Sequence, residues 1–175
     1  MVNLGGATEN DRKKIVITKD SKAFFHNNVD YCVGTGRMGL ALTEEYQEEL
    51  RLVQKEIGFK HIRGHGLFCD DMAIFQTYEE DGKVRVEYNY TYLDRVMDAY
   101  KKVGLRPFLE LGFMPKKLAN GSQTIFYWQG NTTPPKDYDM WCNMVHSLLR
   151  HLMGRYGEEE VIQWPIEVWN EPNLC

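Results

Sequence analysis

The chain has 175 residues, of which 43% are hydrophobic and 26% charged, and its formal net charge is −4. This composition is typical of a globular chain long enough for one sizeable core, and it excludes a fibrous or disordered protein. The 21 basic residues are spread through the sequence and outnumbered by 25 acidic ones, so we expect no nucleic-acid partner and no binding to a membrane.

The N-terminal region and the cysteines indicate the compartment and exclude some chemistry. Residues 1 to 30 are predicted to be a polar arm that lacks the apolar core of a signal peptide, and no window approaches the roughly 18 apolar residues of a membrane span. We therefore predict a cytoplasmic protein. The four cysteines lack the spacing of a zinc site or of a disulfide framework, so we expect reduced thiols, no metal and no cofactor.

The first predicted strand and helix follow the arm. Residues 31 to 34 form a short apolar strand, and residues 35 to 39 form a flexible connection. Apolar residues then recur at three- and four-residue spacing over residues 43 to 57, a segment that Thr43 opens and Gly58 closes. This spacing predicts an amphipathic helix that packs against a sheet.

The same pattern repeats along the rest of the chain. Further strands are predicted over residues 60 to 66, 106 to 113 and 166 to 170, and further helices over residues 91 to 103 and 137 to 156. The connections over residues 67 to 89 and 114 to 136 exceed the usual length of about 2 to 6 residues, which is typical of loops that carry function. The first of them contains a predicted hairpin turn at residues 79 to 83.

Strands that alternate with amphipathic helices indicate βαβ units and a parallel sheet. The sequence lacks the Gly-x-Gly-x-x-Gly turn of dinucleotide-binding proteins, so a Rossmann sheet is not favoured. A complete (β/α)8 barrel needs about 200 residues or more. We therefore predict an α/β fold in which residues 31 to 175 form the first four βα units, the N-terminal half of a TIM barrel.

A carboxylate stands at the end of the last predicted strand. That strand stops at the sequence Asn170, Glu171, Pro172. Pro172 cannot continue a sheet ladder, and it biases Glu171 toward extended geometry. Because catalytic groups of barrel enzymes lie at the C-terminal ends of the strands, Glu171 is a candidate catalytic residue.

Six segments together resemble the β-xylosidases of glycoside hydrolase family 39. They follow the order of that family and span about residues 31 to 174. The segments are residues 31 to 37, 62 to 67, 112 to 116, 126 to 128, 133 to 138 and 167 to 174. A single Asn-Glu-Pro sequence would be weaker evidence than this ordered set.

The resemblance implies a retaining glycoside hydrolase that releases xylose from the non-reducing ends of xylooligosaccharides. The family uses two glutamates: an acid/base at the end of strand four, which matches Glu171, and a nucleophile at the end of strand seven. The predicted elements include no strand seven. The nucleophile is therefore expected outside this sequence, the isolated chain is expected to be inactive, and the full-length parent is expected to be a homo-oligomer.

The resemblance also assigns sugar binding to His65 and Asn170. The family uses the matching histidine to bind the sugar, although a histidine between two glycines is otherwise often a structural turn residue. The amide of Asn170 matches the donor to the sugar 2-hydroxyl, with a turn asparagine as the alternative. Arg63 and Glu110 are charged residues in buried strands, where charges are normally paired. A structural ion pair under the active site is at least as well supported as a direct role in catalysis.

An aromatic run, Phe126, Tyr127 and Trp128, lies in the second long connection. Aromatic rings stack well on sugar faces, but such a run also serves to pin a long loop to the rim of a barrel. The sequence leaves both roles open, and the three residues are retained as a candidate sugar subsite.

Two other functions remain open. Another family 39 specificity, such as iduronidase, would call for a basic pocket, and the conspicuous basic residues Lys116 and Lys117 lie in a segment shared with the xylosidases. Alternatively, the chain is a half-barrel without turnover. An open four-stranded sheet exposes two edges, so it is expected to aggregate, to dimerise or to need its other half.

Overall fold

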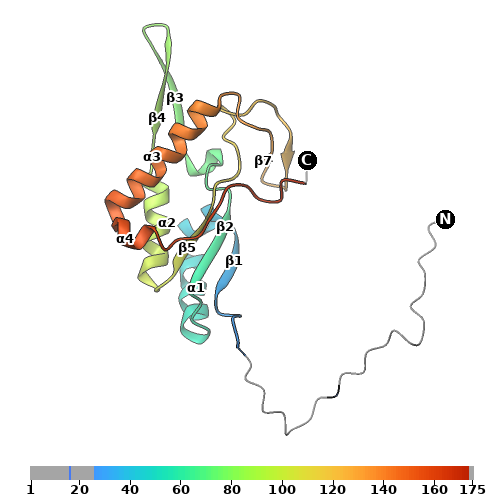
Figure 1. Cartoon of the computed structure of the whole chain (residues 1–175), viewed down its shortest axis with the longest axis vertical. Helices are drawn as coiled ribbons and strands as arrows, with labels where there is room; N and C mark the ends of the chain where they lie inside the picture. The colour runs from blue at the N-terminus through green and yellow to red at the C-terminus, as the bar shows by residue number, and fades with distance from the viewer. Residues whose placement is uncertain (1–15, 17–25, 174–175) are drawn as a thin grey trace, which may run out of the picture.

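The structure is a computed structural model that describes residue 16 and residues 26 to 173 (Figure 1). Of the predicted N-terminal arm, residues 1 to 30, the structure describes residue 16 and residues 26 to 30, and the rest of that prediction lies outside the described residues. Within the described residues, regular structure begins with a strand at Cys32 and ends with a strand at Glu167.

Four parallel strands form the central sheet. They are β1 (Cys32–Arg37), β2 (His61–His65), β5 (Arg106–Glu110) and β8 (Ile166–Glu167), and they lie in that order across the sheet. Their order along the chain and their order in space coincide, as in successive βα units of a barrel. The predicted parallel sheet with alternating helices is confirmed.

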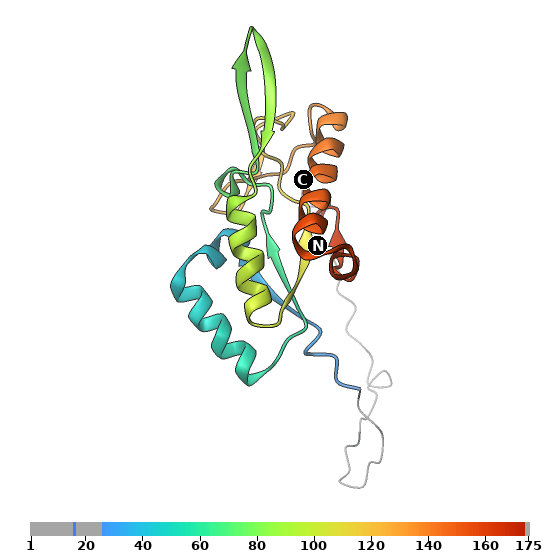
Figure 2. The same ribbon diagram turned by 90° about the vertical axis from the view of Figure 1, so that its left-hand side faces the viewer.

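Three long helices cover one face of this sheet. They are α1 (Glu44–Glu56), α2 (Thr91–Lys102) and α3 (Tyr138–Tyr156), and Figure 2 shows all three in front of the strands. A short helix, α4 (Glu158–Val161), follows α3 and was not predicted. No helix in the described part of the chain is long and apolar enough to cross a membrane.

The hydrophobic core lies between the helices and the sheet. Ile62 of β2 and Leu109 of β5 meet Val96 of α2 and Leu148 of α3 there, and each of these residues is at most 1% exposed. In the two helices, these are the apolar positions that recur at helical spacing in the sequence. Removing this apolar surface from water is the main driving force that holds helices and sheet together.

Side-chain caps explain where two of the helices begin. The hydroxyl of Thr43 accepts a hydrogen bond from the backbone N–H of Tyr46 at 3.4 Å, in front of α1. A carboxylate oxygen of Asp137 accepts one from the N–H of Met140 at 3.0 Å, in front of α3. Such caps satisfy N–H groups that have no partner in the first helical turn. Both helices begin within one residue of the predicted positions.

The two long connections contain small antiparallel sheets. Strands β3 (Phe75–Glu80) and β4 (Lys83–Tyr88) form the predicted hairpin, which projects from the body of the molecule (Figure 1). Its turn is Asp81 and Gly82, both with positive φ, which is typical of a two-residue hairpin loop. In the second connection, β6 (Thr124–Ile125) pairs with β7 (Gly130–Asn131).

The prediction of a flexible connection over residues 35 to 39 is wrong. Strand β1 continues to Arg37, and a 3-10 helix, Met38–Leu42, follows directly. Arg37 pairs with His65 of β2 after an irregularity in the register. Gly36 lies at that irregularity with a φ of 71°, which glycine adopts without strain, so the glycine serves a bulge inside a strand.

Two other strands are shorter than predicted. β5 ends at Glu110 instead of residue 113, and β8 ends at Glu167 instead of residue 170. β8 pairs with β5 through two residue pairs only, and it has no strand on its other side among the described residues. A strand without a second ladder has little to hold its last residues extended, so the backbone bends before Glu171.

Two tyrosines of the core make matched tests of the packing. The hydroxyl of Tyr100 is buried without a hydrogen-bond partner among the described residues, whereas that of Tyr156 donates to Asp98 at 2.7 Å. Tyr100→Phe is therefore expected to leave the free energy of unfolding unchanged or to raise it by about 1 kcal/mol, and Tyr156→Phe to lower it by about 1 kcal/mol. Urea unfolding followed by circular dichroism measures both, and a larger loss for Tyr100→Phe would contradict this packing.

Candidate active site

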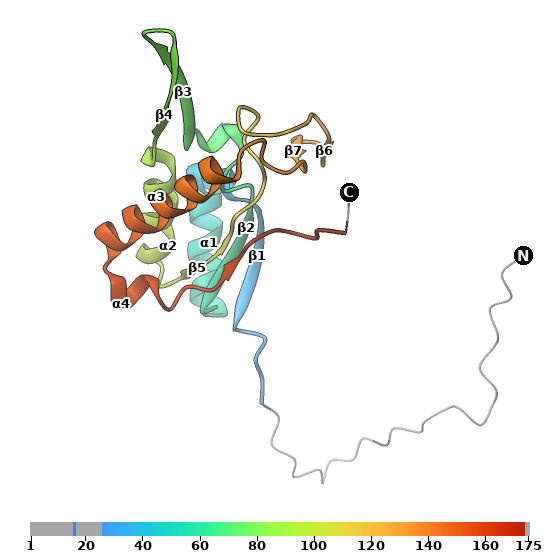
Figure 3. The ribbon, with the colours of Figure 1, turned by 45° about the horizontal axis from the view of Figure 1, so that its top comes forward.

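The candidate residues gather where the strands of the sheet end. His65 is the last residue of β2, Glu110 is the last residue of β5, and Asn170 lies three residues beyond β8. Because the carboxyl ends of parallel strands meet at one edge of a sheet, these side chains share that edge. Figure 3 shows the C-terminal segment leaving β8 and running toward the side of the molecule that carries β6 and β7.

Arg63 is the centre of a polar network under this edge, called here the Arg63 network: Arg63, His65, Glu110, Glu167 and Asn170. Its Nε and Nη2 atoms donate to the two carboxylate oxygens of Glu167 at 2.7 and 2.9 Å. Nη2 also donates to Oδ1 of Asn170 at 2.9 Å and lies 3.1 Å from Oε2 of Glu110. The bond to Glu167 is the main cause that raises the pKa of Arg63. One guanidinium therefore joins three strands and the segment that follows the last of them.

Glu110 is the buried carboxylate of the network. Its exposed fraction is 0%, and its Oε2 atom lies 2.5 Å from Nδ1 of His65. Burial raises the pKa of Glu110, and its neighbours His65 and Arg63 oppose that rise. The predicted ion pair between Arg63 and Glu110 is thus present in the structure, and Glu110 has a second and closer partner in His65.

Asn170 and Glu171 differ sharply in their surroundings. Asn170 is 7% exposed, and its amide oxygen is held by Arg63. Glu171 has a φ of 43°, so the prediction that Pro172 would favour extended geometry there is wrong. Glu171 is exposed, and its side chain has no hydrogen bond or ion pair with the described residues. The carboxylate of the candidate catalytic residue is therefore free, while the residue before it is fixed.

An aromatic cluster packs beside the network, and its members are Phe113, Phe126, Trp128 and Trp169. The ring of Phe113 lies 6.0, 5.3 and 5.8 Å, between centroids, from the other three rings in that order. Phe126 stacks on Trp128 at 5.2 Å, and it lies 6.2 Å from the ring of His65. Because Trp169 precedes Asn170, the cluster ties the second long connection to the end of β8.

The three residues of the predicted aromatic subsite are not equivalent. Phe126 and Trp128 belong to the aromatic cluster, and Phe126 keeps 43% of its surface exposed. Tyr127 is 87% exposed and makes no ring contact with the described residues. Phe113, which is 2% exposed, was not singled out from the sequence, and an aromatic residue at the end of a predicted barrel strand was the available signal.

A cavity of about 240 Å³ adjoins the cluster and is lined in part by Trp128 and Lys116. The guanidinium of Arg37 lies 5.7 Å from the ring centroid of Trp128 and pairs with Asp71. Asp70, which also lines the cavity, accepts a hydrogen bond from the backbone N–H of Lys116 at 3.1 Å. The two carboxylates balance the two basic side chains, so the cavity carries no excess of positive charge.

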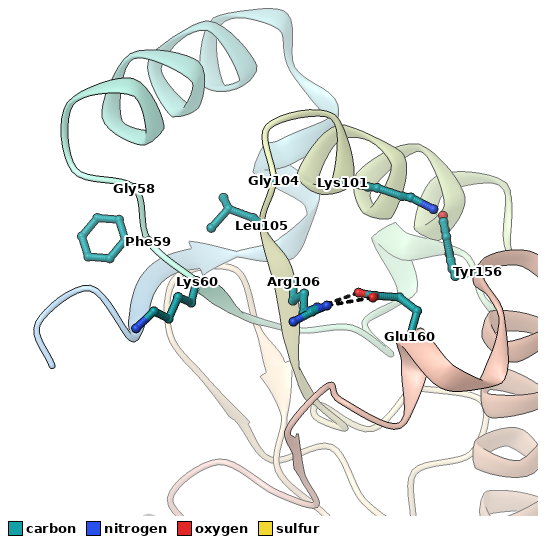
Figure 4. A pocket seen from close by; sticks show the side chains of 9 residues that line it. All are labelled: Gly58, Phe59, Lys60, Lys101, Gly104, Leu105, Arg106, Tyr156 and Glu160. Carbon is teal, nitrogen blue, oxygen red and sulfur yellow. Dashed lines mark hydrogen bonds and ion pairs between the residues drawn. The ribbon is translucent and has the colours of Figure 1, made fainter.

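A larger cavity, of about 630 Å³, lies at the opposite ends of the strands, where β2 and β5 begin (Figure 4). Arg106 and Glu160 face each other there through two hydrogen bonds of 2.8 and 3.0 Å. The amino group of Lys101 lies 5.4 Å from the ring centroid of Tyr156. Lys60, which also lines the cavity, pairs with Asp30 at 3.3 Å. Each charged group of the cavity therefore has a partner, and this end of a barrel sheet contributes to stability rather than to catalysis.

No group of three or more His, Cys, Asp or Glu side chains in the described part of the chain is arranged to hold a metal ion.

Comparison with known proteins relates this chain to one family of glycosidases. Residues 13–175 match the family described as glycosyl hydrolases family 39. The chain is 52% identical over 162 residues to a β-xylosidase of Geobacillus stearothermophilus, which covers 93% of the chain and 32% of that protein. It is 32% identical over 116 residues to an α-L-iduronidase of Homo sapiens, which covers 66% of the chain and 16% of that protein.

A solved structure shows the same likeness in three dimensions. The monomeric β-xylosidase from Caulobacter crescentus superposes with a TM-score of 0.77 at 41% sequence identity, over 83% of this chain and 28% of that one. The chain therefore spans about a third of the length of the xylosidases that it matches.

The Arg63 network predicts a large difference between two arginine substitutions. Arg63→Met leaves the fully buried Glu110 without its arginine partner, and it is expected to lower the free energy of unfolding of the chain by about 3 to 5 kcal/mol. Arg85→Met removes the exposed pair with Glu80 on the hairpin and is expected to cost less than about 1 kcal/mol. Urea unfolding compares them, and equal losses would contradict a structural role for the network.

Proposed function

The chain belongs to glycosyl hydrolases family 39, and on that premise we propose that it acts within a retaining β-xylosidase, with Glu171 as the general acid/base. The reaction releases xylose from the non-reducing ends of xylooligosaccharides. The observation that carries the proposal is the free carboxylate of Glu171 immediately after the anchored Asn170, at the edge of the sheet where barrel enzymes hold their catalytic groups.

Retaining hydrolysis needs two carboxyl groups about 5 to 5.5 Å apart. One attacks the anomeric carbon, and the other protonates the departing oxygen and later deprotonates water. Glu171 takes the second role, because its carboxylate is accessible and unpaired in the part of the chain that the structure describes. The nucleophile is another carboxylate of the complete enzyme, since Glu110 and Glu167 are both tied to Arg63.

Asn170 binds the 2-hydroxyl of the sugar in this proposal. Its Oδ1 atom accepts from Arg63, and its Nδ2 group has no partner among the described residues. The amide therefore presents N–H donors rather than its oxygen to a ligand. Hydrogen bonds to the 2-hydroxyl strengthen in the transition state, so a fixed donor at this position contributes to catalysis as well as to binding.

His65 and the aromatic cluster complete the proposed sugar site. The Nδ1 atom of His65 is engaged by Glu110, which leaves Nε2 for a sugar hydroxyl. Phe126 lies next to His65 with part of its ring exposed, which suits it to stack on the face of a sugar. Tyr127 extends this subsite only if a longer substrate reaches it, because it stands apart from the cluster.

A family 39 iduronidase is the second candidate, favoured by the similarity to the Homo sapiens enzyme. Iduronic acid carries a carboxylate, which a pocket with excess positive charge would stabilise. Lys116 lines a cavity that also contains Asp70 and Asp71, and the amino group of Lys117 donates to the carbonyl of Thr77 at 3.2 Å. This balance of charge favours a neutral sugar such as xylose.

A chimera tests the proposed function directly. The chain replaces the matching segment of the Geobacillus stearothermophilus β-xylosidase, so that the remainder of that enzyme supplies the rest of the barrel. The chimera is expected to hydrolyse p-nitrophenyl β-xyloside and to leave p-nitrophenyl α-iduronide intact. Glu171→Ala is expected to lower kcat by about 10²- to 10⁴-fold, the usual contribution of a general acid/base.

Azide provides the control for mechanism, since it attacks a covalent intermediate without needing a general base. It is expected to restore turnover of the Glu171→Ala chimera and to yield β-xylosyl azide. Glu79→Ala, on the exposed hairpin, is the matched control and is expected to keep full activity. Unchanged activity in Glu171→Ala would remove this residue from the proposed mechanism.

The isolated 175-residue chain is expected to release no xylose, because the proposed nucleophile lies outside it. Size-exclusion chromatography and the p-nitrophenyl xyloside assay on the isolated chain check this together. Turnover by a monomer of the chain alone would contradict the proposal. A homo-oligomeric parent also stays a prediction, and the solved Caulobacter crescentus relative is described as monomeric.

A further inference from the structure

Resting on the proposed function, we infer that Glu110 is a positioning residue that fixes the ring and the tautomer of His65, so that His65 presents a bare Nε2 atom to a sugar hydroxyl. The inference starts from burial. Glu110 is the one charged side chain of the described residues that is fully buried, and buried carboxylates are rare unless a partner compensates them.

The closest partner of Glu110 is His65 and not Arg63. The carboxylate oxygen Oε2 lies 2.5 Å from Nδ1 of His65 and 3.1 Å from Nη2 of Arg63. Arg63 already has both oxygens of Glu167 within 2.9 Å. A counter-ion for Arg63 is therefore supplied without Glu110, and the contact that only Glu110 makes is the one to the imidazole.

That contact decides which nitrogen of the ring carries hydrogen. A carboxylate accepts hydrogen bonds and donates none, so the facing Nδ1 is the nitrogen that carries hydrogen, and in the neutral ring Nε2 is then the bare nitrogen. Nε2 is then a hydrogen-bond acceptor, and the ring cannot turn over without losing the bond to Glu110. A sugar hydroxyl that binds there must act as the hydrogen-bond donor, so its orientation is fixed.

The surroundings keep the carboxylate in place. A Cβ atom at Gly112 would lie 3.0 Å from Oε1 of Glu110, which is tighter than ordinary contact. Phe126 packs 6.2 Å from the imidazole, between ring centroids, on the side of the aromatic cluster. Gly112→Ala is thus a second way to disturb the pair, because it displaces the carboxylate without removing its charge.

A double-mutant cycle in the chimera tests whether Glu110 acts through His65. Glu110→Gln is expected to lower kcat/KM for p-nitrophenyl β-xyloside about 10-fold, the lower end of the range for groups that orient a metal-binding histidine. In a chimera that already carries His65→Ala, the same change is expected to have less than a twofold effect. Full additivity of the two losses would overturn the inference.

Glu167→Gln is the matched control, because it makes the same chemical change next to Arg63 without touching His65. Its effect on kcat/KM is expected to persist in the His65→Ala chimera. If both glutamine variants are additive with His65→Ala, both glutamates act through Arg63 and the inference is wrong. Gly112→Ala replaces Glu110→Gln in the cycle if the latter variant does not fold.

The tautomer itself gives a readout that does not depend on activity. Nitrogen-15 NMR of the chimera labelled at histidine is expected to show His65 with a protonated Nδ1 and a bare Nε2. The opposite tautomer would overturn the inference even in an active enzyme. An inactive chimera that shows the expected tautomer would instead refute the proposed function and leave Glu110 in its positioning role.

Discussion

The contact of one guanidinium with the ends of two strands and with the segment beyond the second is the constraint on which the site depends. Arg63 on β2 holds Glu110 on β5, Glu167 on β8 and the amide of Asn170 just beyond β8. Two carboxylates and a guanidinium under the edge of a sheet are costly to take out of water, and their contacts with one another, with His65 and with Asn170 offset that cost. The register of the strands and the direction of the last segment are therefore coupled to the same ion pairs.

The site combines fixed residues at the strand ends with an accessible Glu171, and this combination suits the proposed chemistry. The Arg63 network and the aromatic cluster anchor the residues on either side of the turn after β8, whereas Glu171 remains accessible. A group that must protonate a leaving oxygen and later deprotonate water needs access to both, and its neighbours need to be rigid. The sheet supplies this support along β2, β5 and β8, and the relatives of family 39 carry about twice as much additional chain around it.

Much of the fold was predictable because hydrophobic spacing reports on burial. The helices and the parallel sheet followed from it, and the hairpin turn followed from Asp81 and Gly82. Strand ends were less predictable, since β8 stops where its ladder stops and not where the apolar pattern stops. Gly36 was interpreted as part of a loop because a glycine at a strand bulge and a glycine in a loop have the same local sequence.

The site was only partly predictable for a similar reason. The sequence singled out Arg63, His65 and Glu110, but spacing along the chain does not show which of two cations a buried carboxylate approaches more closely. The resemblance to family 39 supplied the role of Glu171, whereas the packing of Phe113 between the long connection and Trp169 depends on contacts distant in sequence.

The most direct measurement is a crystal structure of the chimera with xylose bound. The account predicts that Asn170 donates to the sugar 2-hydroxyl while Arg63 holds its oxygen, and that the carboxyl of Glu171 lies about 5 to 5.5 Å from the carboxyl that attacks the anomeric carbon. A Glu171 side chain turned away from the sugar, or a separation beyond about 6.5 Å, would contradict it.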